Sequence, residues 1–409
     1  MRLSLAILLA SGIIGLGATF ALAEEPKFTA HTAGTQQEAG AIKRVDKDWS
    51  ITLASPSAEV AVPGSDLISL RRVGATLPPF PAGPHVVFVN GDRLAGAVAK
   101  IEKGEVHFKA AIGGEGAGGA QELTIPLSAL AVIWFRSPPE DTGEDLARKW
   151  SGERRRRDVL LLSNGDSRAG TVVSMDSLTS ALVLKDEANE IRVEAARLVA
   201  IALNTDLARS LRPRGAYGRA ILSNGGRIGM ASASSDGTLV TGKTLFGAEM
   251  KIPLSQIVCL DIRQGKAVYL SDLKPKRYDY TPYLGVRWPF ALDRSVAGHE
   301  LRLGGHTYDK GIGLHSESRL TFDLGGSYRR FESTVGLDDR TGQGGSVRIR
   351  VLVDGQAKDV GDKEISSATG SRDARVDVTG AKELTLVVEF GSGGDVCDHV
   401  DWADARVVK

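Results

Sequence analysis

The middle of this chain repeats one pattern three times: an apolar run, an Asn-Gly pair, a second strand-like run and a closing apolar motif. Asn-Gly between two apolar runs is the strongest short signal for a β-hairpin, because a type I′ turn needs positive φ at both central residues. A fragmentary earlier copy ends at Val62–Leu67, and a glycine-rich insert at Gly113–Gly119 lengthens the next copy. Repetition at this period predicts tandem copies of one small β unit. The three copies open at Val86–Asp92, Leu160–Asp166 and Ala220–Gly226, and they close at Ile125–Leu130, Ile191–Leu198 and Ile252–Ile257.

Each copy is too short and too rich in strands for anything but a small antiparallel barrel or a bent sheet. In the copy that opens at Leu160, strands are expected around Gly170–Val173, Ala181–Leu184 and Leu198–Leu203. This order resembles the Sm-like, SH3-type barrel. Sm proteins bind RNA in rings, but the repeats lack a clustered basic and aromatic face, so we expect no nucleic acid partner. We expect a scaffold of tandem barrels for self-association or for docking a protein partner.

The composition excludes several classes of protein. Lys and Arg total 51 against 50 Asp and Glu, so the 409-residue chain has no overall field to recruit nucleic acid or an anionic membrane. Two cysteines are too few for a disulfide framework or a thiolate metal cage. A soluble globular protein with ordinary charged and apolar fractions is the remaining class.

The first 23 residues read as a secretory signal peptide. Arg2 precedes an apolar run from Leu3 to Leu22, and Ala21–Ala23 provides an A-x-A cleavage site. No later stretch is long and apolar enough to span a bilayer. We therefore expect an exported protein, periplasmic, cell-surface or secreted, with no membrane span after cleavage.

The last third of the chain differs from the repeats. It holds six of the seven tyrosines, and its apolar residues alternate with polar ones, as in half-buried strands. Turns are expected at Asp354-Gly355 and Gly325-Gly326. The pattern predicts a β-sandwich of about eight strands. The clearest strands are Arg319–Leu324, Phe331–Val335, Val347–Val353 and Leu384–Phe390.

Five separated motifs in this part occur in an order that resembles the NPCBM/NEW2 family. They are Tyr269–Leu273, Lys310–His315, Val335–Asp339, Val353–Gly355 and Asp398–Ala405. The family is a carbohydrate-binding module similar to the galactose-binding-like jelly rolls found beside glycoside hydrolases. The resemblance covers roughly residues 268–409 and implies sugar binding, often with a structural calcium ion.

Sugar recognition needs an aromatic face for the C–H side of the ring and planar polar groups for its hydroxyls. Trp402 lies in a closing strand and is expected in the core. Calcium would take hard oxygen ligands, here Asp395, Asp398 and Asp401, although their spacing is not that of an EF-hand loop. The candidate sugar-binding residues are Trp288, Tyr308, His315, Asp338, Asp339, Arg340 and His399.

The sequence predicts an all-β chain of tandem small barrels followed by a galactose-binding-like jelly roll. We expect an exported, non-catalytic carbohydrate-binding protein; a structural or protein-interaction protein without sugar affinity is the alternative. A glycoside hydrolase-associated protein ranks third, because a hydrolase needs two carboxylates flanking a cleft and the repeats offer only scattered turn acids such as Asp92 and Asp166. The expected segments are a signal peptide (1–23), a degenerate first repeat with a linker (24–83), barrel repeats (84–140, 154–204 and 216–266) and the sandwich (268–409).

Overall fold

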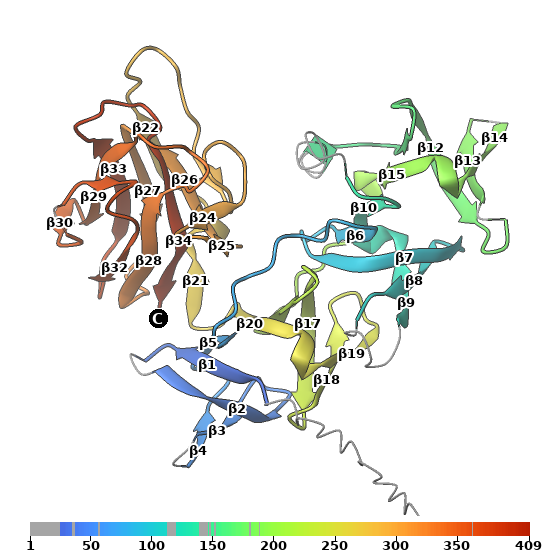
Figure 1. Ribbon diagram of the computed structural model, residues 1–409, viewed down its shortest axis with the longest axis horizontal. Helices are drawn as coiled ribbons and strands as arrows, with labels where there is room; N and C mark the ends of the chain where they lie inside the picture. The colour runs from blue at the N-terminus through green and yellow to red at the C-terminus, as the bar shows by residue number, and fades with distance from the viewer. Residues whose placement is uncertain are drawn as a thin grey trace, which may run out of the picture.

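The computed structural model describes residues 25–409, except 35–36, 56–57, 113–119, 139–145, 147–148, 151–152, 180, 188 and 362. The predicted signal peptide and the Gly113–Gly119 insert lie outside the described residues. Strands dominate the rest, so the predicted all-β class is confirmed. The strands form a column of small units beside a separate sandwich (Figure 1). No described helix has the length and apolar character needed to cross a membrane.

The column consists of four units of five strands each. In every unit the first strand pairs antiparallel with both the second and the fifth strand, which closes the unit. A one-turn 3-10 helix precedes the fifth strand of the last three units. The first unit, expected as a degenerate copy, has all five strands. The units are β1 (Lys27–Thr32), β2 (Gln37–Val45), β3 (Ile51–Ala54), β4 (Glu59–Val62) and β5 (Leu67–Arg72); β6 (His85–Phe88), β7 (Arg93–Glu102), β8 (Glu105–Ala110), β9 (Gln121–Pro126) and β10 (Leu130–Trp134); β11 (Asp158–Leu162), β12 (Ser167–Met175), β13 (Ala181–Asp186), β14 (Asn189–Glu194) and β15 (Leu198–Ala202); and β16 (Tyr217–Leu222), β17 (Arg227–Ser235), β18 (Leu239–Thr244), β19 (Glu249–Pro253) and β20 (Ile257–Arg263).

The second strand of each unit carries a register shift at the same place. The shifts lie between Ile42 and Arg44, Val98 and Lys100, Val172 and Ser174, and Met230 and Ser232. A bulge bends a strand and increases its twist. Each long second strand can therefore serve both the hairpin with the first strand and the hairpin with the third.

The Asn-Gly hairpins are present, but their predicted turn type is wrong. Only the glycine of each pair has positive φ, for example 83° at Gly91, and the asparagines do not. Gly91 N–H donates to Phe88 O and Phe88 N–H to Asp92 O, which is a type I turn closed by a glycine bulge. Asn90 Oδ1 accepts from the backbone N–H of Asp92, so the asparagine acts through its side chain.

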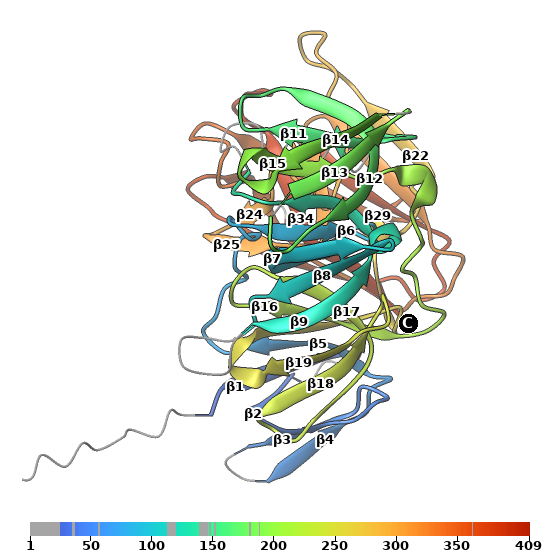
Figure 2. The same cartoon turned by 90° about the vertical axis from the view of Figure 1, so that its right-hand side faces the viewer.

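The units are fused through their strand edges. The fifth strands β10 and β15 pair, and so do the fifth strands β5 and β20. Second strands also meet, β7 with β12 and β2 with β17, while Arg227 on β17 pairs with Arg93 on β7. Along the column the order is therefore third, second, fourth, first unit (Figure 2). One hydrophobic core runs through all four.

The C-terminal part is a two-layered sandwich, as predicted, with its own core and a fully buried Trp402. One sheet has the order β23-β26-β34-β28-β32, with β21 on β34; the other has β22-β27-β33-β29-β30, with β31 on β29. A separate hairpin, β24–β25, packs at one end. The strands are β21 (Ala267–Tyr269), β22 (Arg277–Tyr280), β23 (Ala291–Leu292), β24 (Leu301–Leu303), β25 (His306–Tyr308), β26 (Gly311–His315), β27 (Ser318–Asp323), β28 (Arg330–Leu337), β29 (Ser346–Val353), β30 (Gln356–Lys358), β31 (Ile365–Ser366), β32 (Arg372–Asp377), β33 (Glu383–Phe390) and β34 (His399–Val408).

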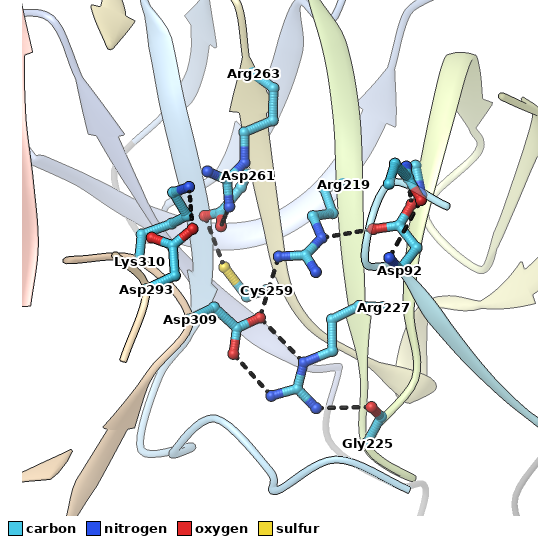
Figure 3. A network of polar contacts seen from close by, with 12 residues as sticks. Asp92, Arg219, Gly225, Arg227, Cys259, Asp261, Arg263, Asp293, Asp309 and Lys310 are labelled. Atoms are coloured by element: carbon cyan, nitrogen blue, oxygen red, sulfur yellow. Dashed lines mark hydrogen bonds and ion pairs between the residues drawn. The ribbon is translucent and has the colours of Figure 1, made fainter. Parts of the chain in front are cut away.

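Buried ion pairs hold the sandwich on the column (Figure 3). Asp309 receives both Nε and Nη2 of Arg227 at 3.0 and 2.9 Å, and Arg219 Nη1 lies 3.3 Å away. Arg219 Nε also donates to Asp92, at 2.8 Å, which ties the second unit to the fourth. Burial opposes the charge on Asp309, but Arg227 and Arg219 hold its pKa well below the usual range. A second pair joins Arg71 to Asp404 at 2.7 Å.

Candidate functional site

Three aromatic side chains gather at one end of the sandwich. The rings of Trp288 and His315 stack 4.9 Å apart with an interplanar angle of 2°. The ring of His399 lies 5.0 Å from Trp288 and 5.4 Å from His315. We call these three residues the ring cluster.

The strands explain why the ring cluster forms. His315 ends β26 and is directly opposite His399, the first residue of β34, in the antiparallel register. Cross-strand neighbours of this kind place their side chains within contact distance. Trp288 comes from the loop between β22 and β23, and its backbone carbonyl accepts a hydrogen bond of 2.8 Å from Tyr278 Oη.

A second layer of rings supports the ring cluster. Tyr280 meets His315 edge-on at 6.4 Å, and Tyr278 meets Phe290 edge-on at 5.1 Å. His315 is buried, whereas Trp288 and His399 are half-buried. The ring cluster therefore offers a supported, partly open aromatic face.

Both histidines of the ring cluster favour the neutral form. Burial lowers the pKa of His315. Burial, and then the neighbouring His315, lowers the pKa of His399. His315 Nδ1 lies 2.6 Å from the carbonyl oxygen of Ser316, so Nδ1 is the donor there and Nε2 is left as an acceptor. A neutral imidazole of this kind suits a hydroxyl group, which can donate or accept.

Of the predicted polar residues Asp338, Asp339 and Arg340, the first lies beside the ring cluster and the other two serve the fold. The backbone N–H of Asp338 donates to His399 O at 2.9 Å, which places this carboxylate next to the histidine. Asp339 accepts from the backbone N–H groups of Gly304 and Gly305, at 2.9 and 2.7 Å, and so fixes the β24–β25 turn. Arg340 forms an ion pair with Glu300 at 3.6 Å.

Tyr308 is not brought to the ring cluster. It lies on β25, where it lines a small cavity with Arg71, Leu77 and Val258 of the column. Asp404 of the sandwich and Arg71 of the column are its charged neighbours, so Tyr308 lies where the two parts meet. The sequence could not reveal this, because the position depends on which neighbouring unit covers the hairpin.

The predicted calcium ligands do not fit a metal site. Asp398 accepts from the hydroxyl of Ser316 and from the backbone N–H of Ser346, so both oxygens are engaged. Asp401 accepts from the N–H of Arg302, and burial followed by the adjacent Asp338 raises its pKa well above the usual range. Within the described ranges, no group of three or more His, Cys, Asp or Glu side chains is arranged to hold a metal ion. Asp395, Asp398 and Asp401 therefore form no such group.

Sequence reasoning missed the two supporting tyrosines. Tyr278 and Tyr280 are two residues apart on β22, so they project from the same face of the strand. Two tyrosines at this spacing, shortly before Trp288, indicate an aromatic face on the strand. The exposed apolar side chains of Tyr283, Leu284 and Val286 on the following loop were also overlooked.

Comparison with known proteins identifies the sandwich. Residues 266–408 match the NPCBM/NEW2 domain, so the resemblance predicted for this part of the chain is confirmed. A protein of Renibacterium salmoninarum, assigned by name as an endo-alpha-N-acetylgalactosaminidase, is 29% identical over 109 residues. The match covers 27% of this chain and 7% of that protein, so the chain spans less than a tenth of this relative's length.

Solved structures of CBM51 modules are also similar to this chain. The CBM51 of a family 95 glycoside hydrolase from Clostridium perfringens, in complex with methyl-galactose, is 30% identical and covers 35% of this chain and 99% of that chain, with a TM-score of 0.31. The CBM51-2 and INT domains of Clostridium perfringens ZmpB, in complex with GlcNAc, are 29% identical over 42% of this chain and 36% of that chain, with a TM-score of 0.32.

Proposed function

We propose that this chain is an exported, non-catalytic carbohydrate-binding protein whose ring cluster, Trp288, His315 and His399, contacts the sugar. The parallel stack of Trp288 on His315 is the observation that carries the proposal. A flat, half-open indole suits the C–H face of a pyranose, and the neutral imidazoles suit its hydroxyls.

The acids near the ring cluster support a binding role without catalysis. Asp339 and Asp398 are committed to backbone and hydroxyl donors within the domain. Asp338 and Asp401 lie side by side in the interior, where they cannot flank a substrate in a cleft. The column then serves as the scaffold that presents the module.

A protein partner is the second candidate, because the loop before Trp288 exposes apolar side chains. Leu284 is 80% exposed and Tyr283 is 56% exposed. Tyr283 packs edge-on against Phe390 at 5.4 Å, so the loop is anchored to the sandwich. Exposed apolar groups of this kind also occur where proteins meet.

The test is a titration of the full chain with neutral saccharides, beginning with methyl-galactoside and N-acetylglucosamine, followed by a glycan array. The variant Trp288→Ala should weaken binding by about tenfold or more, because it removes the stacking face. The variant His399→Ala should also weaken it, whereas His306→Ala, on an exposed hairpin position of the same domain, should not.

Equal binding by the Trp288→Ala variant would rule out the ring cluster as the contact site. A folded chain that binds no glycan on the array would exclude the function itself. The second candidate would be favoured if the wild-type chain captured a protein partner and the variants Tyr283→Ala and Leu284→Ala did not.

A further inference from the structure

A cleft lies away from the ring cluster, where the column meets the sandwich. It has a volume of about 950 Å³, at the upper end for ligand pockets. Its walls come from the linker 208–212, from Asn90 in the second unit, from Tyr217 and Arg263 in the fourth unit, and from residues 267–272 at the start of the sandwich. Figure 1 shows β21 passing from the column into the sandwich at this place.

The side-chain charges lining this cleft are unbalanced. Arg209, Arg212, Arg263 and Lys409 line it against one acid, Asp272. Lys310 forms ion pairs of 2.6 Å with that acid and with Asp293. Arg263 is paired with Asp261 at 3.2 Å, so the unpaired positive charge of the lining comes from the linker arginines. No ion pair joins Arg209 or Arg212 to another residue of the described part, and both are exposed. The net charge of the whole chain is only +1, so this concentration of positive charge is local.

The cleft wall also holds hydrogen-bond donors that lack partners among the described residues. They are Arg263 Nε, Tyr269 Oη and Ser271 Oγ. All three side chains are at least nine-tenths buried. Buried donors are rarely left without an acceptor, so the polar character of this wall extends below its surface.

The linker that supplies the arginines is fixed in place. The backbone N–H of Arg209 donates to Ser128 O at 2.7 Å, and Leu211 is buried in the core of the column. The guanidinium groups of Arg209 and Arg212 are therefore carried by an anchored segment. An arginine held in this way can bind carboxylate or sulfate oxygens in pairs.

We propose that this cleft binds an acidic saccharide through its carboxylate or sulfate groups. Asn90, Ser210 and Gln264 on the walls suit the hydroxyls of such a chain. A nucleic acid fits less well, because Tyr269 is buried and Tyr217 alone is half-open, whereas single strands stack on successive aromatic faces. The site is separate from the ring cluster and does not depend on the proposed function.

The experiment is isothermal titration of the full chain with oligogalacturonate and with dextran sulfate. Methyl-esterified oligogalacturonate and plain dextran are the matched neutral probes. We expect binding of at least one acidic probe that weakens as salt is raised, and no binding of its neutral counterpart. Inorganic sulfate and a DNA oligonucleotide of similar charge complete the set.

Three variants locate the site. The pair Arg209→Gln with Arg212→Gln should lower the affinity by about tenfold or more, since each hydrogen bond to a charged group contributes substantially. Arg214→Gln makes the same change on the same segment outside the cleft lining and should leave the affinity within about twofold. Trp288→Ala should also leave it unchanged, which separates this site from the ring cluster.

Five outcomes would overturn the proposal, and the first four concern specificity. They are equal binding of the neutral probes, an equal loss in Arg214→Gln, binding of inorganic sulfate alone, and DNA bound as tightly as the acidic saccharides. Failure of both acidic probes to bind would overturn it as well.

Discussion

The ring cluster and the junction, where Asp309 of the sandwich meets Arg227 and Arg219 of the column, differ in how far their polar groups are engaged. At the junction, Asp309 is enclosed and both its oxygens are taken by Arg227 and Arg219. In the ring cluster, Trp288 and His399 stay half-buried, and His399 is kept neutral by its surroundings. The charges of the junction are committed to fixing the sandwich on the column, whereas the rings of Trp288 and His399 remain partly accessible. The difference separates the end of the sandwich that is joined to the column from the end that stays partly open.

The largest effect is expected when the buried ion pair of the junction is removed. Asp309→Ala leaves Arg227, which is fully buried, without its counter-ion. Removing one partner of a buried pair costs about 3–5 kcal/mol, so we expect a loss of that size in the free energy of unfolding, measured by urea denaturation. Asp46→Ala breaks the exposed pair with Arg44 and should cost at most about 1 kcal/mol. Glycan binding at the ring cluster should survive in the folded variant; its loss would mean that the two regions are not independent.

Acid should weaken the junction through His31. Burial, and then Arg71, lowers the pKa of His31 to about 4. The folded chain therefore stays unprotonated at this site while the unfolded chain takes up a proton below pH 6.5, so stability is lost as the pH falls from about 6.5 to 4. The loss is at most about 3 kcal/mol. His31→Gln should flatten this part of the stability–pH curve, and His306→Gln should not; identical curves for His31→Gln and wild type would contradict the assignment.

Asp398, behind the ring cluster, should respond to pH with the opposite sign. Its pKa is raised to about 6, mainly by burial. Between about pH 4 and 6 the folded chain binds the proton more tightly than the unfolded chain, so this group lowers stability as the pH rises through that range. The cost is roughly 3 kcal/mol. Asp398→Asn should lose this dependence in thermal melts between pH 4 and 7. A variant that melts in parallel with wild type would show that Asp398 ionises as freely as in the unfolded chain.

The sequence predicted what depends on local signals and missed what depends on distant partners. Asn90-Gly91 marked its hairpin correctly, but a glycine with positive φ satisfies a bulged type I turn as well as a type I′ turn, so the turn type was open. The strand edges that fuse the units were not predicted. One signal for them was present in Ile257–Arg263, whose mainly apolar sequence shows little alternation. A strand covered on both faces lacks alternation, and every residue of this strand is buried.

The candidate site divides along the same line. Trp288, His315 and His399 have the residue types that a sugar site needs, and the strand register brings the histidines together. Asp339 is an equally suitable residue type, but its carboxylate accepts hydrogen bonds from the β24–β25 turn. Tyr308 is also suitable, but it lies against the column. Residue type indicates what a side chain can do; only the fold shows whether it is already engaged.

The pairing of the second unit with the third and of the first unit with the fourth sets an order of assembly during synthesis. Residues of β5 such as Arg71 wait for Cys259 on β20, which is made nearly two hundred residues later. Until then the edge of β5 is open, and an open edge can pair with another chain. The second and third units are adjacent in sequence and can pair first. The first unit gains its neighbouring strand only when β20 is made. A chain that stops before β20 would therefore keep three of the four units and leave the edge of β5 without its partner strand.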